Sequence, residues 1–247
     1  MRNVSRLAGK VAVVTGGSRG IGLATAEALV SHGVHVLVCG RSESALVDAK
    51  NHLNRLTNDA GPVGRVEVTR AELRDAGQAE RAVTLAVEQF GGLDILINNA
   101  GVGHFKEVAD LSVEDWQEVI ETNLSGIFYC CRAAIPALRR RGGGWIINIS
   151  SLAGSHPFAG GAVYCASKAG VNAFSEALMQ ELRHDDIRVS CVAPGSVGTA
   201  FGDGHRHAKA PWKLAATDVA QVVVDLLEHE RRSLPSRVEI RPSRPRK

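Results

Sequence analysis

The sequence predicts a doubly wound α/β fold, in which a seven-stranded, mostly parallel sheet carries helices on both faces. Short apolar runs rich in β-branched residues alternate with longer segments whose apolar residues recur every three or four positions. Strands that alternate with helices favour parallel pairing through right-handed crossovers. Because the 247 residues are 45% hydrophobic and 22% charged, they can bury a full core, and we expect one domain over residues 1–247.

Seven strands are expected where the apolar runs are short and rich in valine and isoleucine. β-Branched side chains pack well on a pleated, buried surface. Each run is too short for an ordinary helix and is bounded by glycine, proline or polar residues. In chain order the runs are VAVVT at 11–15, VHVLVC at 34–39, VGRVEV at 63–68, LDILIN at 93–98, WIINI at 145–149, IRVSCV at 187–192 and RVEI at 237–240.

Helices are expected between these strands, where the apolar spacing is helical. The clearest segments are 21–31, 79–90, 113–140, 162–183 and 219–229, and 113–140 is interpreted as one continuous helix. Residues 200–213 precede the last helix and hold a polar loop with glycine, histidine, arginine and lysine. Because this loop follows the sixth strand on the expected ligand side of the sheet, it is a candidate substrate lid.

Composition excludes several classes of protein. The net charge of +3 is small and no long basic block crosses the body of the chain, which disfavours nucleic-acid binding. The five cysteines are odd in number and show no C-x-x-C spacing, which indicates reduced cysteines. The N-terminus has no apolar signal region, and no apolar run reaches the roughly 18 to 20 residues of a membrane span. We therefore expect a cytoplasmic protein without membrane contact.

The first strand runs into the glycine turn TGGSRGIG at 15–22, followed by an alanine-rich helix. Gly16 allows the turn, Gly20 lets a pyrophosphate approach the backbone, and Gly22 lets the helix press on the sheet. An ordinary glycine turn is the alternative, but the strand before it and the helix after it favour a dinucleotide site of the Rossmann fold. The turn also contributes Ser18, Arg19 and Ile21 to the expected cofactor site.

The end of the second strand points to NADP(H) and not to NAD(H). An acidic residue there would bind a ribose hydroxyl, whereas this chain has Arg41. Arg41 and Arg19 could together hold a 2′-phosphate, although either alone is more often a solvated surface charge. Glu43 is the rival ribose ligand. Because Glu43 follows Ser42, a good N-cap, a first-turn acidic residue of a helix explains it more simply.

Tyr164 and Lys168 lie four positions apart, which places them on one face of the expected helix. A tyrosine needs nearby positive charge to exchange protons near neutral pH, because its pKa is ordinarily about 10. By spacing alone an exposed Tyr–Lys pair is the commoner explanation. Ser151, however, ends the fifth strand 13 positions before Tyr164, at the edge where doubly wound folds bind ligands.

Together these motifs resemble the short-chain dehydrogenase/reductase family over nearly the whole chain, particularly its NADP(H)-preferring members similar to 3-oxoacyl-carrier-protein reductases. Besides the glycine turn, the matching pieces, in chain order, are Asn98-Asn99-Ala100-Gly101, Asn123 within Glu-Thr-Asn-Leu, Ser151, the 164–168 segment, and Pro194-Gly195 with Thr199.

The resemblance implies a catalytic set. Tyr164 would be the general acid and base for the substrate oxygen, and Ser151 would hydrogen-bond the same oxygen. Lys168 would lower the Tyr164 pKa and bind the nicotinamide ribose, while Asn123 would bend its helix and hold a water linked to Lys168. Ser150 is expected to be structural because neighbouring strand residues point in opposite directions.

The resemblance also implies further cofactor contacts. Val197 would use its backbone and Thr199 its hydroxyl on the nicotinamide amide, although a plain turn at the strand end is the alternative. In the family an Asp near the adenine often follows the third strand, where this chain has Glu67, so the adenine contact stays open. The remaining expected contacts, besides Tyr164 and Lys168 themselves, are Asn98, Ala100, Gly101, Pro194 and Gly195.

The substrate pocket is expected to be partly apolar, from residues that follow the strand ends. Its candidate lining residues are Phe105, Leu152, Phe158, Phe201 and Trp212, and His104 and His156 lie nearby in sequence. These side chains suit a 3-oxoacyl group or another hydrophobic ketone better than a sugar. His205 and His207 lack a carboxylate cluster, so we expect no metal.

Three functions remain open. The first is an NADPH-dependent carbonyl reductase, which also works as a secondary alcohol dehydrogenase on a small-molecule substrate. The second is an NADP-dependent dehydrogenase of serine-like 3-hydroxy acids, suggested by the ending Glu239-Ile240-Arg241-Pro242. The third is a non-catalytic NADP(H)-binding module.

Family relatives form tetramers through long helices such as 113–140 and 162–183, so a homo-oligomer, and specifically a homotetramer, is expected. The basic tail 241–247 is expected to be extended and solvated, and a docking strip for an acidic partner such as acyl carrier protein is the alternative.

Overall fold

The computed structural model describes residues 5–56, 64–201 and 210–244. Its strands form one seven-stranded sheet in the order β3-β2-β1-β4-β5-β6-β7, and every neighbouring pair is parallel. The strands are β1 Val11–Thr15, β2 His35–Gly40, β3 Val66–Arg70, β4 Ile95–Asn98, β5 Gly144–Ile149, β6 Ile187–Pro194 and β7 Arg237–Ile240. The order reverses between β1 and β4, which creates the crevice where such sheets bind ligands.

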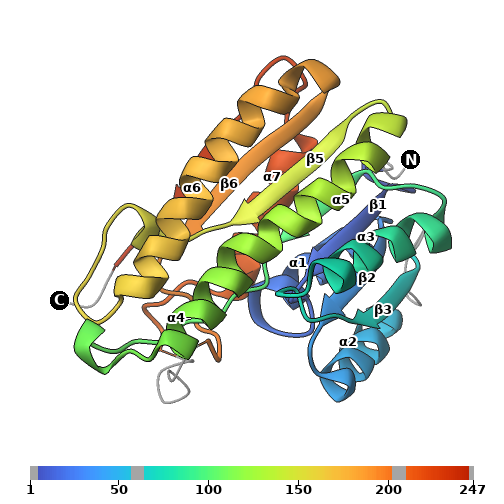
Figure 1. Cartoon of the computed structure of the whole chain (residues 1–247). Coiled ribbons are helices and arrows are strands. Elements are labelled where there is room, and N and C mark those ends of the chain that lie inside the picture. The colour runs from blue at the N-terminus through green and yellow to red at the C-terminus, as the bar shows by residue number, and fades with distance from the viewer. Residues whose placement is uncertain (1–4, 57–63, 202–209, 245–247) are drawn as a thin grey trace.

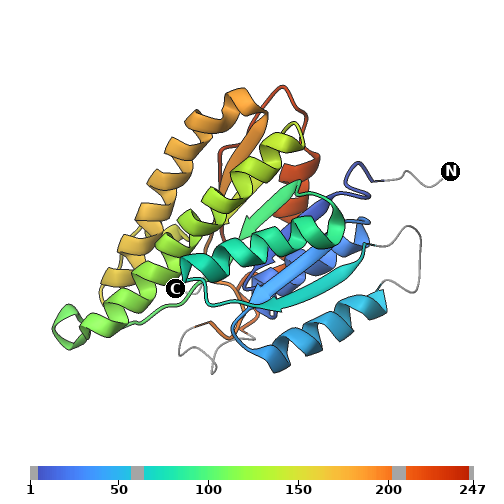
Figure 2. The same ribbon diagram turned by 45° about the vertical axis from the view of Figure 1, so that its right-hand side comes forward.

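Helices cover both faces of the sheet, as the alternating pattern predicts. In Figure 1 helices α3, α5 and α6 lie in front of the strands, and α1 and α7 lie behind them. The helices are α1 Gly20–Ser31, α2 Glu43–Leu56, α3 Ala76–Phe90, α4 Val113–Ile120, α5 Gly126–Arg140, α6 Ala162–Leu182 and α7 Ala216–Glu228. Figure 2 shows α5 and α6 running side by side.

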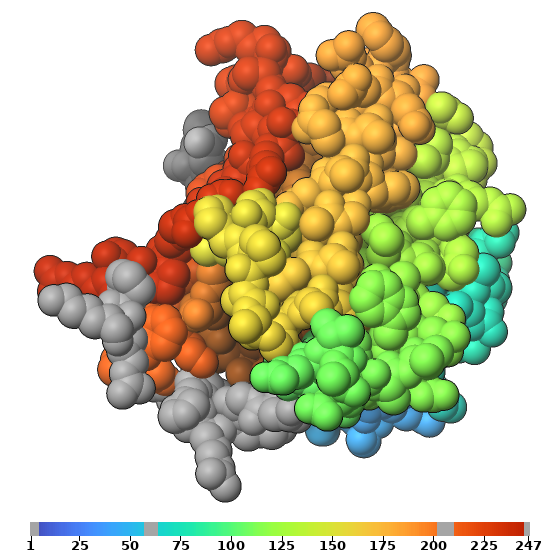
Figure 3. Space-filling model, turned by 60° about the vertical axis from the view of Figure 1, so that its left-hand side comes forward, coloured from blue at the N-terminus to red at the C-terminus, as the bar shows by residue number. Residues whose placement is uncertain are grey.

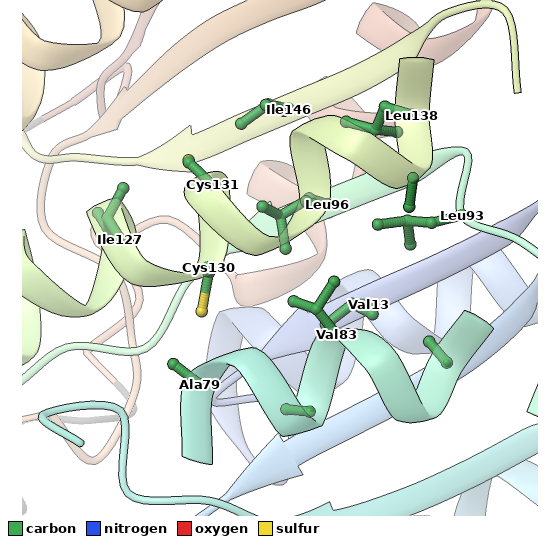
Figure 4. Close-up of a cluster of buried hydrophobic side chains, with 14 of the residues drawn as sticks. Val13, Ala79, Val83, Leu93, Leu96, Ile127, Cys130, Cys131, Leu138 and Ile146 are labelled. Carbon is green, nitrogen blue, oxygen red and sulfur yellow. The ribbon is translucent and has the colours of Figure 1, made fainter. Parts of the chain in front are cut away.

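Two apolar layers sandwich the sheet because successive strand residues point to opposite faces. Val13 belongs to the layer under α3, α5 and α6, whereas its neighbour Val14 belongs to the layer under α1, α2 and α7. Figure 4 shows part of the first layer, where Val83 of α3 and Leu138 of α5 lie near Leu96 of β4. This packing fixes the strand ends and hence the position of the site above them.

Several elements differ by up to three residues from their expected bounds, and two differences bear on the site. The third strand, expected at 63–68, occupies Val66–Arg70, and residue 63 lies outside the described residues. The segment 113–140 is not one regular helix, because a π-helical turn at Glu121–Ser125 separates α4 from α5. In this turn the Gly126 N–H bonds to the Glu121 carbonyl five residues earlier. The extra residue per turn re-aims the side chains around Asn123.

Within the described ranges, no helix combines the length and the apolar composition that a bilayer crossing requires. Among the same residues, no three His, Cys, Asp or Glu side chains gather as a metal site, and His205 and His207 lie outside them. Of the expected lid at 200–213, only the two ends, 200–201 and 210–213, are described.

Candidate active site

A cleft of about 1340 Å³ lies over the carboxyl ends of the central strands. It runs from the glycine turn after β1, past the ends of β4 and β5, to the segment after β6. Most residues predicted from sequence to form the site line this cleft. They are Gly16, Ser18, Arg19, Gly20, Ile21, Arg41, Ala100, Gly101, Phe105, Ser151, Leu152, Phe158, Tyr164, Lys168, Pro194, Gly195, Val197, Thr199, Phe201 and Trp212.

The glycine turn has the close contacts that a phosphate cradle needs. Gly16 has a φ of +62°, and a Cβ there would lie 2.8 Å from the Ala100 Cα. A Cβ on Gly22 would lie 2.4 Å from the Gly16 carbonyl oxygen, so Gly22 supports the turn from below and does not line the cleft. Bare backbone at the N-terminus of α1 leaves room and N–H donors for a pyrophosphate, so the turn fits a dinucleotide.

The loop after β4 is fastened to this turn by a residue that the sequence did not single out. The Asn99 amide nitrogen donates to the carbonyls of Thr15 and Gly16 at 3.0 and 3.1 Å. In return, the Thr15 hydroxyl accepts the Asn99 and Ala100 N–H groups at 2.9 and 3.1 Å. Asn99 therefore holds the two loops that form the floor of the cleft.

The interpretation of Asn98 as a cofactor contact needs correction. Its side chain is 1% exposed and does not line the cleft. Its amide nitrogen donates to Asn148 Oδ1 at 2.8 Å and to Cys131 Sγ at 3.3 Å. Because neighbouring residues at a strand end point in opposite directions, Asn98 ties β4 to β5 while Asn99 faces the glycine turn.

The adenosine end of the cleft carries cations and one unexpected carboxylate. Arg41 and Arg19 both line it, which fits a 2′-phosphate. Arg41 Nη1 lies 3.1 Å from one carboxylate oxygen of Glu118 on α4, and His104 Nε2 lies 2.9 Å from the other. These two partners lower the pKa of Glu118, His104 first and Arg41 second. Glu43, the rival ribose ligand, does not line the cleft.

Near the adenine position, Glu67 does not line the cleft and instead pairs with Lys50 at 2.8 Å. The residues after β3 that do line it are Ala71, Glu72 and Leu73. β3 ends at Arg70, two residues later than expected, and Glu72 is the acidic residue after it that lines the cleft. In the sequence, Glu72 is the next acidic residue after Glu67, which was the available signal.

Lys168 lies within the floor of the cleft, where its side chain is almost fully buried. Nζ donates to the Ile149 carbonyl at 2.9 Å, and burial lowers the pKa of the amine to about 8. Nζ is 5.8 Å from the centroid of the Tyr164 ring. The remaining two N–H donors of the ammonium are the ones that could bind ribose hydroxyls.

Tyr164 stands beside Lys168 on α6, one helical turn earlier. Burial raises the pKa of its phenol to about 12, and a hydrogen bond with Ser151 acts in the opposite direction. The lowering of the Tyr164 pKa expected from Lys168 is absent in the chain alone, where loss of solvation is the largest cause of the shift. Tyr164 is thus held as a neutral phenol, which is the proton-donating form.

Asn123 is fully buried and its amide is committed to protein partners. Oδ1 accepts the Val102 N–H at 2.8 Å, while Nδ2 donates to the Val102 carbonyl at 2.9 Å and to Ser167 Oγ at 3.0 Å. Ser167 in turn donates to the Tyr164 carbonyl at 2.7 Å. Asn123 therefore couples the π turn to the loop after β4 and to the first turns of α6.

Ser150 and Ser151 both line the cleft but differ in their contacts. Ser150 is buried and donates to Asn172 Oδ1 at 2.6 Å, which anchors it to α6. Ser151 faces the cleft with Tyr164. The segment after β6 then crosses toward the glycine turn, where a Cβ on Gly20 would lie 3.3 Å from the Thr199 methyl carbon.

Comparison with known proteins gives the family. A model of the short chain dehydrogenase family matches residues 10–210. The chain belongs to this family. It is 36% identical over 200 residues to a 3-oxoacyl-[acyl-carrier-protein] reductase of Chlamydia muridarum, covering 81% of this chain and 79% of that protein.

Two solved structures of similar proteins contain the cofactor. A metagenomic short-chain oxidoreductase in complex with NADP is 34% identical, with a TM-score of 0.84 over 98% of this chain and 100% of that one. An actinorhodin polyketide ketoreductase with NADPH is 29% identical, with a TM-score of 0.86 over 96% of this chain and 98% of that one. This short-chain dehydrogenase is accordingly an oxidoreductase.

In this short-chain dehydrogenase, aromatic rings gather around the predicted acid. The ring of Phe105 lies 5.5 Å from that of Tyr164, and Phe201 lies 5.6 Å from Tyr164 on another side. Phe158 lies 6.1 Å from Phe105. Trp212 and Leu152 also line the cleft, as do His104 and His156. Of the residues predicted for the substrate pocket, Phe105, Phe158 and Phe201 therefore gather at Tyr164, and the others line the same cleft.

Proposed function

We propose that the protein is an NADPH-dependent carbonyl reductase that also oxidises the matching secondary alcohol. The observation that carries the proposal is the position of Tyr164. Its phenol shares the cleft with Ser151, whose side chain acts to lower the Tyr164 pKa, and with buried Lys168 and the glycine turn. A proton donor at one end of a dinucleotide cleft is what reduction of a carbonyl requires.

Each side chain has a distinct part in this proposal. Tyr164, held as a neutral phenol, donates its proton to the carbonyl oxygen, and Ser151 hydrogen-bonds that oxygen. Lys168 places a cation near the phenol as negative charge develops on it. Asn123 positions α6 through Ser167. NADPH, when bound, supplies the hydride.

We propose NADPH over NADH because Arg41 and Arg19 both line the adenosine end of the cleft. A guanidinium can bind a 2′-phosphate in bidentate fashion, whereas NADH offers only a hydroxyl there. The two NADP-containing neighbours support the same choice. For the substrate, the aromatic lining around Tyr164 supports a 3-oxoacyl or other hydrophobic ketone.

One observation favours the 3-hydroxy acid dehydrogenase as the second candidate. Arg241 lines the cleft, where it could bind a substrate carboxylate. Its guanidinium already lies 2.7 Å from a Glu239 oxygen, so a carboxylate would have to compete with that pair. This competition is why we place the carbonyl reductase first.

The test is oxidation of NADPH and NADH against a panel of 3-oxoacyl esters, diketones, aromatic ketones and 3-hydroxy acids. We expect turnover with NADPH and a loss of about 10²- to 10⁴-fold in Tyr164→Phe. Tyr129→Phe is a matched control, because Tyr129 is the other tyrosine of the chain and does not line the cleft. Cofactor binding without turnover of any substrate would instead favour a non-catalytic NADP(H)-binding module.

We also propose that the chain forms a homo-oligomer, with a tetramer as the first expectation. Large apolar side chains are exposed on and just before α4 and on α5, namely Val108, Val113, Trp116 and Phe128. Figure 3 shows α5 and α6 side by side on one face of the molecule. Light scattering at micromolar concentration tests this, and a monomeric mass would contradict it.

A further inference from the structure

Phe105 and Phe201 pack against the Tyr164 ring, Phe158 packs against Phe105, and these three phenylalanine rings form an enclosure beside Tyr164. Phe105 meets Tyr164 edge-on, at 5.5 Å and an interplanar angle of 68°. It also lies 6.1 Å from Phe158 and 6.5 Å from Phe201, and Phe201 lies 5.6 Å from Tyr164. These separations and tilts are those of favourable aromatic pairs. Rings from two separate segments thus contact Tyr164, and a ring from a third segment extends the group through Phe105.

The same rings remain accessible to solvent inside the cleft. Phe105, Phe158 and Phe201 are 38%, 49% and 39% exposed. Exposed phenylalanine costs free energy in water, and apolar side chains that gather in a cleft mark a site for an apolar ligand. Because the rings surround the proton donor, the ligand that covers them is the part of the substrate next to its carbonyl.

Two glycines make room for the rings. A Cβ on Gly103 would lie 2.9 Å from Phe105 Cζ and 3.1 Å from Phe201 Cε1. A Cβ on Gly161 would lie 2.5 Å from Phe158 Cε2. Neither glycine has a φ between +20° and +160°, so space and not backbone conformation explains glycine at both positions. Any larger residue would push the rings from these positions.

We propose that this enclosure binds the aryl group of an aryl ketone, and that Gly103 and Gly161 determine specificity by seating its rings. The proposal rests on the proposed carbonyl reductase function and names its substrate class. Aromatic pairs contribute beyond the area they bury, whereas a saturated ring of similar size gains only the burial. The short distances to Tyr164 require the aryl ring to be joined directly to the carbonyl carbon or within one or two bonds of it.

The first test compares acetophenone with cyclohexyl methyl ketone, which has a ring of similar size without π-electrons. We expect kcat/KM to favour the aryl ketone by about 2- to 12-fold, the range of one aromatic pair. Phe105→Leu should reduce this preference toward 1. Phe90→Leu, a phenylalanine outside the cleft, should retain it. A preference of 1 or below in the wild type, or a full preference in Phe105→Leu, would overturn the proposal.

The second test uses the glycines. Gly103→Ala and Gly161→Ala should each lower the ratio of kcat/KM for the aryl ketone to kcat/KM for the cyclohexyl ketone. The methyl added at Gly103 would displace Phe105 and Phe201, and the methyl added at Gly161 would displace Phe158. Gly77→Ala is the control, because its Cβ would meet only an Asp75 side-chain oxygen at 3.3 Å. Circular dichroism melting of each variant separates misfolding from displaced rings. If both variants fold and their aryl-to-cyclohexyl ratios of kcat/KM equal that of the wild type, the glycines do not determine specificity.

Direct binding keeps this proposal distinct from the proposed function. Ligand-observed NMR measures the affinities of acetophenone and cyclohexyl methyl ketone for the NADP⁺-saturated protein without turnover. Tyr164-dependent turnover of cyclohexyl methyl ketone, with no aryl preference in rate or affinity, would reject the enclosure and keep the reductase. An aryl preference in binding with no carbonyl turned over would keep the enclosure and reject the reductase. Failure of acetophenone to bind at all would reject the enclosure.

Discussion

Replacing Asn123 with alanine should destabilise the protein, because its amide joins three segments. The substitution removes the hydrogen bonds to the Val102 N–H and carbonyl, at 2.8 and 2.9 Å, and the bond to Ser167 Oγ at 3.0 Å. Ser167 keeps its bond to the Tyr164 carbonyl, so its hydroxyl retains one partner. The two main-chain groups of Val102 lose theirs.

The size of the loss follows from these two groups. A buried main-chain group without a partner costs about 1–3 kcal/mol. Because Val102 is only partly buried, water can reach it, and we take the low end for each group, about 2 kcal/mol in total. For a chain of this length, that lowers Tm by roughly 4–8 °C.

Thermal unfolding followed by circular dichroism measures this loss. Asn51→Ala is the matched control, since Asn51 is an exposed residue of α2. Asn123→Asp keeps an oxygen that accepts from the Val102 N–H but places the other carboxylate oxygen against the Val102 carbonyl in a buried site, so its Tm should also fall below that of the wild type. An Asn123→Ala protein that melts within about 1 °C of the control would refute the reasoning.

Three further outcomes follow from charges in the cleft. Arg41→Ala should weaken NADPH binding about 10- to 100-fold with little change for NADH, and fluorescence titration showing equal losses would count against a 2′-phosphate site. Glu118→Gln should raise the ratio of the affinity for 2′,5′-ADP to that for 5′-AMP by up to about 5-fold in calorimetry, because Glu118 competes with the 2′-phosphate for Arg41 in a partly exposed pair. Glu114→Gln on the same helix is the control, and an unchanged ratio in Glu118→Gln would contradict the competition. For Lys168, whose pKa falls from 10.5 to about 8 on burial, the unfolded state binds more protons between these pH values, so stability rises with pH there. Urea unfolding should show the wild type gaining up to about 3 kcal/mol over Lys168→Met from pH 8 to 10.5, and a constant difference would disprove the shift.

The sheet could be predicted from the sequence because its signal is local. A run such as Val11–Thr15 is buried on both faces, so every residue in it is apolar or small. This composition alone is enough to predict a strand. Parallel pairing then follows from the alternation with helices. Ser42 was expected to begin a helix for a similar local reason, and the Ala45 N–H does donate to its hydroxyl at 3.3 Å.

The π turn could not be predicted from helical spacing. Apolar residues recur at nearly helical intervals through 113–140, so one extra residue leaves little trace in the pattern. What holds the turn is the pairing of Asn123 with Val102, 21 residues away in the chain. A contact of this kind exists only after β4 and α4 have been placed in space.

Glu118 was missed for a related reason. On sequence it is one of several acidic residues of an exposed helix, where a solvated charge is the usual outcome. It lies four positions before Thr122, and both line the cleft, so they share the face that the helix turns toward the cofactor site. Once Asn123 is assigned to the site, that spacing becomes an available signal.

Alcohol oxidation by the proposed mechanism needs a Tyr164 phenolate beside a charged Lys168. In the chain alone, the pKa shifts of both groups disfavour that pair of charged forms. Burial raises the pKa of Tyr164 to about 12 and lowers that of Lys168 to about 8, so a neutral phenol is favoured. That state is ready to donate a proton to a carbonyl oxygen. Removal of a proton from an alcohol requires the phenolate, which needs positive charge beyond Lys168, and an oxidised nicotinamide carries that charge. The surroundings of Tyr164 therefore favour the neutral phenol in the chain itself and leave the phenolate dependent on added positive charge.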